Sequence, residues 1–250
     1  MKKLVIISGS GRGLGSSIAK SFVKNGYSVA INYYKSEEKA KDLVASLGDS
    51  AKAYRADISD LDQVKAMLAD IEKEFGTFPS ILVNNAMTEY SFNGDLRKTA
   101  ETITWQEISD HLDITLKGSL NLIQSLVPAM KKNHYGRVIN VGTNLVQNPV
   151  VPYHDYTIAK AALLGLTRTF AKDLGPMGIT VNMISGGLLK VTDASAATPE
   201  AVFEAIATMT PLQKITTVED FADATLFFAS EHSRSITGQN LTVDGGLTFN

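Results

Sequence analysis

The sequence predicts a doubly wound α/β fold, with about seven parallel strands and helices on both faces of the sheet. Three observations predict it. Short apolar runs rich in β-branched residues recur along all 250 residues. Helical patterns separate the early runs. The runs are almost continuously apolar, which is typical of parallel strands buried on both faces. We expect one domain spanning 1–250, with a substrate loop at about 187–216.

The expected strands are short runs bounded by Gly, Ser, Asp or Asn. They are Lys3–Ser8, Ser28–Tyr33, Ser50–Arg55, Ser80–Asn84, Arg137–Val141, Thr180–Ile184 and Asn240–Val243.

Helices are expected between the early strands, at Gly13–Asn25, Ser36–Leu47 and Leu61–Phe75. Gly26 suits the position just after the first helix, where a left-handed residue is common. Two pairs have the spacing of a capping box. Asp60 and Gln63 would begin the third helix. Thr104 and Glu107 would begin a long helix over 105–133, and a second long helix is expected over 153–175.

Composition excludes several classes of function. The net charge is -2, without a long basic run, which argues against nucleic-acid and membrane-surface partners. The absence of Cys excludes disulfides and fits a reducing, cytoplasmic setting. No apolar stretch approaches the ~20 residues of a membrane span. No group of His, Asp and Glu has the spacing of metal ligands, so no metal is expected.

A glycine-rich turn joins the first strand to the first helix. Its residues are Ser8-Gly9-Ser10-Gly11-Arg12-Gly13-Leu14-Gly15. Glycines at such a turn let the backbone approach a pyrophosphate at the helix N-terminus. The spacing departs from the usual G-x-G-x-x-G pattern, and a plain strand–helix connection is the alternative. The position at the first βα turn favours dinucleotide binding.

The end of the second strand indicates which dinucleotide is bound. Sites for NAD usually carry an acidic residue there, on the ribose hydroxyls. Here Tyr33 occupies this region and no acid appears before Glu37. Arg12 and Lys35 are placed to meet a 2′-phosphate instead, although both also suit a solvated surface. We therefore expect NADP(H).

Tyr156 and Lys160 lie four residues apart, on one face of an expected helix. A free tyrosine has a pKa near ~10. A neighbouring ammonium favours the phenolate and lowers that pKa. The pair is therefore a candidate general acid and base for a carbonyl or alcohol, although many helix faces carry such a pair without function.

Together the glycine turn and the Tyr156/Lys160 pair resemble the short-chain dehydrogenase/reductase family over nearly the whole chain. Asn84-Asn85-Ala86 resembles the family segment that supports the sheet and contacts the cofactor, with Met87 replacing its final Gly. Asp57, followed by Ile58, resembles the adenine-binding position. Gly186-Gly187 resembles the turn beside the nicotinamide, and Lys160 would also hold the nicotinamide ribose.

Two catalytic positions depart from the family pattern. Thr143 stands 13 residues before Tyr156, where the family usually has Ser, and it keeps a hydroxyl for the substrate oxygen. Thr115 stands where the family has an Asn whose carbonyl helps to hold a water leading to the Lys. An ordinary buried helix residue is an equally good interpretation of Thr115.

The resemblance is strongest to 3-oxoacyl-[acyl-carrier-protein] reductases. It implies NADPH-dependent reduction of a 3-oxoacyl thioester, with an acyl carrier protein as the candidate carrier, and a homotetramer. Lys131 and Lys132 are candidate contacts for an acidic carrier, whereas Met177 occupies a position that is often basic in such enzymes. The alternatives are a reductase of another small or cyclic ketone, a catalytically weak nucleotide-binding regulator, and a sugar-nucleotide epimerase or dehydratase.

Overall fold

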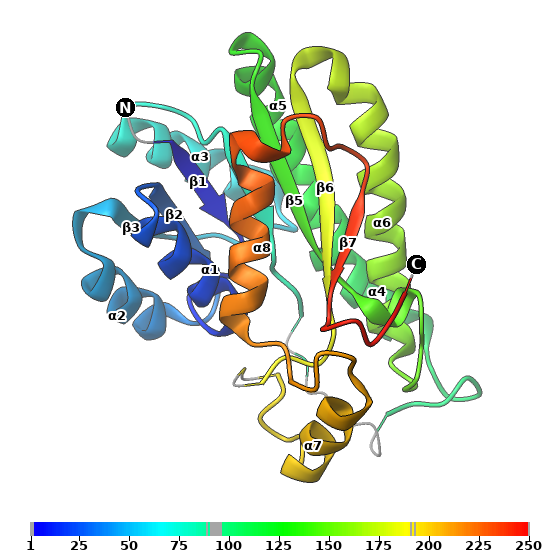
Figure 1. The fold of residues 1–250 in the computed structure, drawn as a ribbon. Coiled ribbons are helices and arrows are strands. Elements are labelled where there is room, and N and C mark those ends of the chain that lie inside the picture. Colours follow the sequence, from blue (N-terminus) through cyan, green and yellow to red (C-terminus); the bar gives the residue numbers. More distant parts are fainter. Residues whose placement is uncertain (1–2, 89, 91–96, 191, 193, 250) are drawn as a thin grey trace.

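Seven parallel strands form one sheet in the computed structural model, which describes residues 3–88, 90, 97–190, 192 and 194–249 (Figure 1). The strand order is β3-β2-β1-β4-β5-β6-β7. Every neighbouring pair is parallel, for example Val5 beside Val29 and Ile81. This confirms the predicted doubly wound fold.

All seven predicted strands are present, two of them with the predicted ends and five with different ends. They are β1 (Leu4–Ile7), β2 (Ser28–Tyr33), β3 (Ala51–Arg55), β4 (Ile81–Asn84), β5 (Gly136–Thr143), β6 (Ile179–Gly186) and β7 (Asn240–Val243). Strands β5 and β6 are longer than predicted because they pair with each other over eight residues, from Gly136 beside Ile179 to Thr143 beside Gly186. Small and polar residues at their ends are thus drawn into the sheet.

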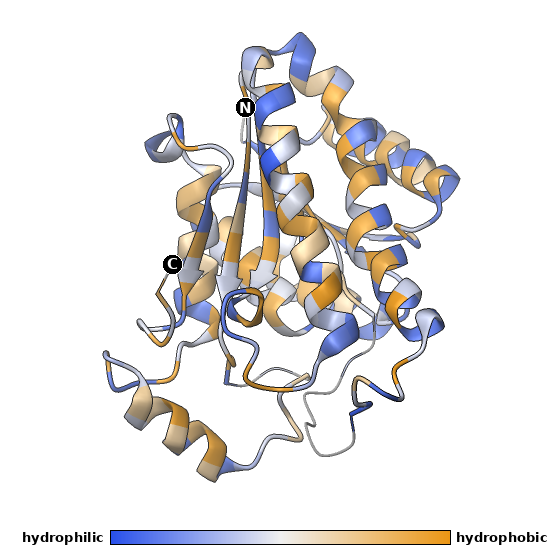
Figure 2. Ribbon diagram, turned by 90° about the vertical axis from the view of Figure 1, so that its right-hand side faces the viewer, coloured by the Kyte–Doolittle hydropathy of each residue, from blue (hydrophilic) through white to orange (hydrophobic). Residues whose placement is uncertain are grey.

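Two helical layers enclose the sheet (Figures 1 and 2). One contains α1 (Gly13–Lys24), α2 (Glu37–Leu47) and α8 (Val218–Ala229), and the other contains α3 (Leu61–Phe75), α5 (Ser119–Lys132) and α6 (His154–Leu174). Successive residues of β1 pack against opposite layers. Val5 and Ile7 pack against the first layer, and Leu4 and Ile6 pack against the second. Burial on both faces explains why the strand is apolar throughout.

The remaining helices of the described residues are shorter. They are α4 (Trp105–Leu112), the π-helical segment η3 (Asp113–Gly118), α7 (Glu200–Met209), and the 3₁₀ segments η1 (Gly48–Ser50), η4 (Asn144–Val146), η5 (Gly175–Met177) and η6 (Glu231–Ser233).

The predicted helix over 105–133 is therefore interrupted, since six residues of π-helix separate α4 from α5. Its capping box is confirmed, because Thr104 and Glu107 bond each other's backbone N–H groups. The second predicted box is only half formed. Asp60 accepts from the backbone of α3, but the Gln63 Oε1 accepts from the Asp57 N–H and not from Asp60.

The order in which strands are added to the sheet reverses at β1. This strand pairs with β2 on one side and with β4 on the other. Ligands of doubly wound sheets bind beyond the strand carboxyl ends at such a point. The glycine turn follows β1 there, and Asn84 ends β4. The predicted loop at 187–216 also lies at this edge, and it contains α7 (Figure 1).

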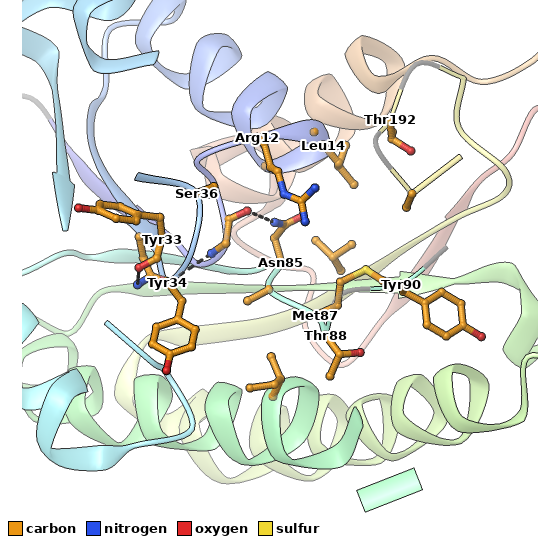
Figure 3. Close-up of a pocket in the computed structure, with 18 of the residues that line it drawn as sticks. Arg12, Leu14, Tyr33, Tyr34, Ser36, Asn85, Met87, Thr88, Tyr90 and Thr192 are labelled. Carbon is orange, nitrogen blue, oxygen red and sulfur yellow. Dashed lines mark hydrogen bonds between the residues drawn. The ribbon is translucent and has the colours of Figure 1, made fainter. Parts of the chain in front are cut away.

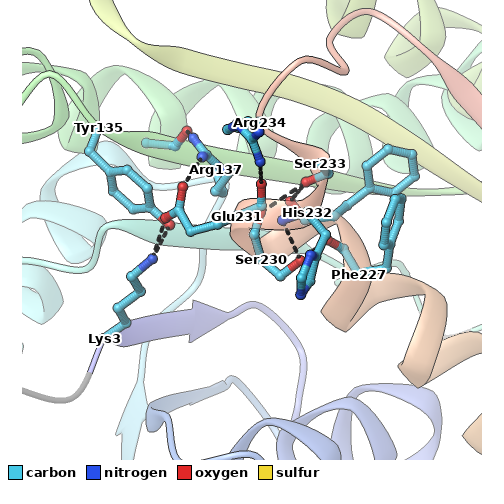
Figure 4. Close-up of polar contacts among 11 residues, drawn as sticks. Lys3, Tyr135, Arg137, Phe227, Ser230, Glu231, His232, Ser233 and Arg234 are labelled. Carbon is cyan, nitrogen blue, oxygen red and sulfur yellow. Dashed lines mark hydrogen bonds and ion pairs between the residues drawn. The ribbon is translucent and has the colours of Figure 1, made fainter.

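A polar cluster closes the opposite end of the sheet (Figure 4). Glu231 accepts from Lys3 at 2.6 Å and from Arg137 at 3.4 Å. Lys3 also donates to the Tyr135 hydroxyl at 2.9 Å. Arg137 is only 4% exposed, so Glu231 supplies the charge that this buried guanidinium needs.

Candidate active site

The glycine turn is packed against the segment that follows β4. A Cβ on Gly9 would lie 2.8 Å from the Ala86 Cα, and one on Gly15 would lie 2.7 Å from the Asn85 Nδ2. Asn85 donates to the carbonyls of Ser8 and Gly9 at 3.0 and 3.1 Å. Only glycine fits these two contacts. The two segments therefore form one rigid wall.

Gly13 differs from the packed glycines. Its φ is +56°, a conformation that L side chains rarely adopt, and nothing described lies within 4 Å of its Cβ position. The backbone is thus bare toward the cleft where α1 begins, as anion binding at a helix N-terminus requires. Arg12 is the N-cap residue of this helix.

The turn borders a cavity of about 730 Å³ at the carboxyl edge of the sheet (Figure 3). Most of the predicted cofactor residues line it, namely Gly9, Arg12, Gly13, Leu14, Gly15, Tyr33, Lys35, Asp57, Ile58, Asn85, Ala86, Tyr156, Lys160, Gly186 and Gly187. Tyr33 lies at one end in Figure 3 and Tyr90 at the other, so the cleft is elongated. An extended ligand such as a dinucleotide suits this shape.

Three predicted residues support the cavity without lining it. Ser10 is fully buried and donates to the Ile7 carbonyl at 2.7 Å. Asn84 is 2% exposed and donates to the Asn140 Oδ1 at 2.8 Å, which ties β4 to β5. A Cβ on Gly11 would lie 2.7 Å from the Ser36 hydroxyl. None of the three lines the cavity, so their predicted contact with the cofactor stays a prediction.

Asn32 is a supporting residue that the sequence analysis missed. Its Oδ1 accepts from the Gly9 N–H at 3.1 Å, and its Nδ2 donates to the Ala56 carbonyl at 3.1 Å. One buried side chain thus fixes the glycine turn relative to the end of β3. The available signal was a polar side chain at the penultimate position of a buried strand.

Tyr156 and Lys160 lie in the first two turns of α6 and are 7% and 2% exposed. The Lys160 Nζ donates to the Val141 carbonyl at 2.6 Å and lies 5.7 Å from the centre of the Tyr156 ring. Burial lowers the pKa of Lys160 to about 8, so the ammonium form still dominates at pH 7.

The pKa of Tyr156 differs from the expected direction. Burial raises it to about 12, and only a hydrogen bond with Thr143 acts in the opposite sense. Desolvation of the phenolate thus outweighs the effect expected from Lys160. The phenol remains protonated at neutral pH, ready to donate.

Thr143 ends β5 at 4% exposure, and it caps η4 by accepting from the Leu145 N–H at 3.3 Å. Its hydrogen bond with Tyr156 brings these two residues together, although they are 13 residues apart in the sequence. Thr143 does not itself line the cavity.

Thr115 is placed differently. It lies in η3 at 2% exposure, and its carbonyl accepts from the Ser119 hydroxyl at 2.6 Å. Its own hydroxyl has no hydrogen-bond partner among the described residues. The carbonyl expected to hold a water thus already accepts one side-chain hydrogen bond, which leaves its second lone pair for a water.

No group of three or more His, Cys, Asp or Glu side chains in the described ranges is arranged to hold a metal ion. Within the same ranges, no helix is long and apolar enough to cross a bilayer.

Comparisons with known proteins agree with this geometry. A family model described as enoyl-(acyl carrier protein) reductase matches residues 9–248. The chain is 35% identical to the 3-oxoacyl-[acyl-carrier-protein] reductase FabG of Staphylococcus aureus, over 99% of this chain and 98% of that protein. The FabG of Staphylococcus epidermidis is 34% identical, with 99% of both chains covered. The chain belongs to the short-chain dehydrogenase/reductase family.

A solved structure carries the same fold over the whole length. It is a 3-ketoacyl-(acyl-carrier-protein) reductase from Brucella melitensis complexed with NADH, with a TM-score of 0.88 and 26% identity, covering 99% of this chain and 98% of that one. As a short-chain dehydrogenase/reductase, this protein is a nicotinamide-dependent oxidoreductase that acts on CH–OH and C=O groups.

The residues present fit a nicotinamide dinucleotide. The bare backbone at Gly13 offers N–H groups to a pyrophosphate. Asp57 and Ile58 line the cavity beside β2, whereas Lys160, Gly186 and Gly187 line it beside β5 and β6. Adenine would lie in the first region and nicotinamide in the second.

Proposed function

We propose that this enzyme uses NADPH to reduce 3-oxoacyl thioesters to 3-hydroxyacyl thioesters. The observation that carries the proposal is the joint placement of Tyr156 and Lys160 on the cavity that the glycine turn borders. The names of the relatives, each aligned over nearly the full chain, support the thioester substrate.

The chemistry divides between cofactor and protein. Bound NADPH supplies the hydride that reduces the carbonyl carbon. Tyr156 donates its phenolic proton to the carbonyl oxygen, which suits a phenol whose pKa burial raises to about 12. Thr143 bonds the same oxygen and orients it. Lys160 retains two further N–H donors beyond its bond to Val141, and these hold the ribose.

NADPH is proposed over NADH because of the residues around the adenine end. Arg12, Tyr33 and Lys35 line the cavity there. Asn32 replaces an acid at the end of β2 and is occupied with the glycine turn. Cationic residues there, together with an amide instead of an acid near the end of β2, favour the additional phosphate of NADP(H).

The proposed partner is an acyl carrier protein, which presents the thioester. Lys131 and Lys132 end α5 and are exposed, as contacts with an acidic carrier require. The proposed assembly is a homotetramer built on the α4–α5 and α6 faces, in line with closed symmetry in soluble oligomers. Light scattering that gives a monomer mass would reject the tetramer.

The decisive experiment is a substrate panel with wild-type enzyme and NADPH. Acetoacetyl thioester should be reduced at least as well as a cyclic ketone, whereas a crotonyl thioester should not react. Tyr156→Phe should lower turnover by about 10²–10⁴-fold while NADPH still binds. Tyr54→Phe is the matched control, since the Tyr54 hydroxyl contacts Glu74 outside the cavity.

The alternatives give different results in this panel. Reduction of small ketones alone would leave only the general reductase, and reduction of crotonyl thioester would indicate an enoyl reductase. Binding of NADPH without turnover of any substrate would indicate a regulator.

A further inference from the structure

A buried polar network lies beside Tyr156 and has no part in the chemistry described above. It joins Tyr90, His111 and Asp155, which are 8%, 4% and 9% exposed. These residues come from the segment after β4, from α4 and from the first turn of α6. Taking a carboxylate out of water is costly unless its oxygens are bonded.

Both Asp155 oxygens are occupied. Its Oδ1 accepts from the Tyr156 backbone N–H at 2.9 Å and from the Tyr90 hydroxyl at 3.2 Å. Its Oδ2 lies 3.4 Å from the His111 Nε2. One carboxylate therefore holds the backbone of Tyr156 and also the ring that packs against its side chain.

Tyr90 is that ring. It stacks on Tyr156 with 5.3 Å between centroids and 23° between planes. It meets His111 edge-on, with 5.0 Å between centroids and 88° between planes. Tyr90 also lines the cavity, at the end opposite Tyr33 (Figure 3). It thus lies between the substrate space and the polar pair.

The neutral form of His111 fits its neighbours. Burial and the charges of Lys160 and Arg97 lower the pKa of His111, whereas Asp155 and Asp110 act to raise it. The imidazole is therefore neutral at pH 7. The Thr88 hydroxyl lies 3.1 Å from Nδ1 and 2.9 Å from Nε2. The Nε2 atom thus lies near both the Thr88 hydroxyl and the Asp155 carboxylate, at 2.9 and 3.4 Å.

We propose that Asp155 and His111 are positioning residues for Tyr156, acting through Tyr90. The inference rests on the proposed role of Tyr156 as the general acid. A capping function alone does not require this arrangement, because an exposed Asp or Ser satisfies a helix N-terminus equally well. Displacement of a reacting group by about 1 Å can cost about 10²-fold in rate, so a device that fixes the phenol matters.

The test uses the full-length enzyme and separates geometry from charge. Asp155→Ala removes both acceptors and should lower kcat by about 10- to 100-fold. Asp155→Asn keeps an oxygen for Tyr90 and the backbone, so kcat should stay within about threefold of wild type. Tyr90→Phe should lower kcat by about two- to tenfold. The KM for NADPH should remain within about twofold throughout.

Asp110→Asn is the control. This carboxylate lies on α4 with His111, is exposed and accepts a hydrogen bond from Gln106, so its loss should leave kcat unchanged. Thermal midpoints identify a variant that fails to fold. In that case Tyr90→Phe, which removes only a hydroxyl, decides the matter. Wild-type kcat in folded Asp155→Ala or in Tyr90→Phe would overturn the proposal.

A measurement that needs no cofactor tests the contact between His111 and Asp155. The pKa of His111 can be followed by imidazole NMR and assigned with His111→Gln. Loss of the carboxylate charge in Asp155→Asn should lower the pKa of His111 further, and an unchanged pKa would overturn the pairing. If Tyr156→Phe keeps its turnover, the proposed function fails, while this NMR result still stands as a separate test.

Discussion

The buried ammonium of Lys160 should make the stability of the enzyme rise with pH above neutrality. Burial lowers its pKa from 10.5 to about 8. The unfolded chain therefore binds the proton more tightly than the folded protein between these two values. Stability increases with pH wherever the unfolded state holds more protons. The buried charge thus lowers the free energy of unfolding at pH 7, and this loss of stability disappears as the pH rises toward 10.5.

The size of the effect follows from the shift. A change of about 2.5 units, at about 1.36 kcal/mol each, gives about 3 kcal/mol. About 2 kcal/mol of this should be recovered between pH 7 and 9.5. The upper limit matters because Tyr156, whose pKa is raised to about 12, contributes with the opposite sign above pH 10.

The assay is urea unfolding of wild type and Lys160→Met at several pH values. Methionine removes the ammonium and keeps the length of the side chain. The difference in unfolding free energy between the two proteins should change by about 2 kcal/mol from pH 7 to 9.5, in favour of wild type. A constant difference in unfolding free energy between the two proteins does not affect this test. Parallel curves would show that Lys160 titrates normally and that its burial has no electrostatic cost.

Three further perturbations test other parts of the structure. If the Thr143 hydroxyl holds the substrate oxygen, as proposed, Thr143→Ser should retain turnover and Thr143→Val should lose most of it; equal activity of the Val variant would assign that role elsewhere. Arg12→Ala should weaken NADPH binding by about tenfold to a hundredfold and spare NADH. Arg168→Ala, on the exposed face of α6, should change neither affinity. Glu231→Gln should lower the free energy of unfolding by about 1–3 kcal/mol in a urea titration, because it leaves the buried Arg137 without its anion; an unchanged midpoint would mean that solvent already neutralises Arg137.

The sequence located the elements of the fold because each buried strand carries its own apolar signal. It placed their ends less well. Thr143 and Gly186 are strand residues only because β5 and β6 pair along their full lengths. The π-helical interruption at 113–118 has no local signature, since apolar spacing on either side fits one continuous helix.

The site was predictable where its residues are close in sequence. The glycine turn and the pair Tyr156/Lys160 both have a fixed local spacing. The group formed by Tyr90, His111 and Asp155 spans 65 residues and exists only through tertiary contact. Spacing also gave the wrong direction for the pKa of Tyr156, because spacing reports a neighbouring charge but not the depth of burial.

Thr115 and His111 lie in adjacent helical segments that contact the same helix, α6. Thr115 lies in η3, directly after the helix that carries His111, and η3 and α4 both pack against α6. The Thr115 hydroxyl is left without a described partner, whereas one turn earlier His111 engages Asp155. Among the described residues, the polar contacts that reach the start of α6 therefore come from His111 and not from the Thr115 hydroxyl. If Tyr156 is the acid, as proposed, the contact between α4 and α6 is the part of the structure that holds it in place, whatever Thr115 contributes near Lys160.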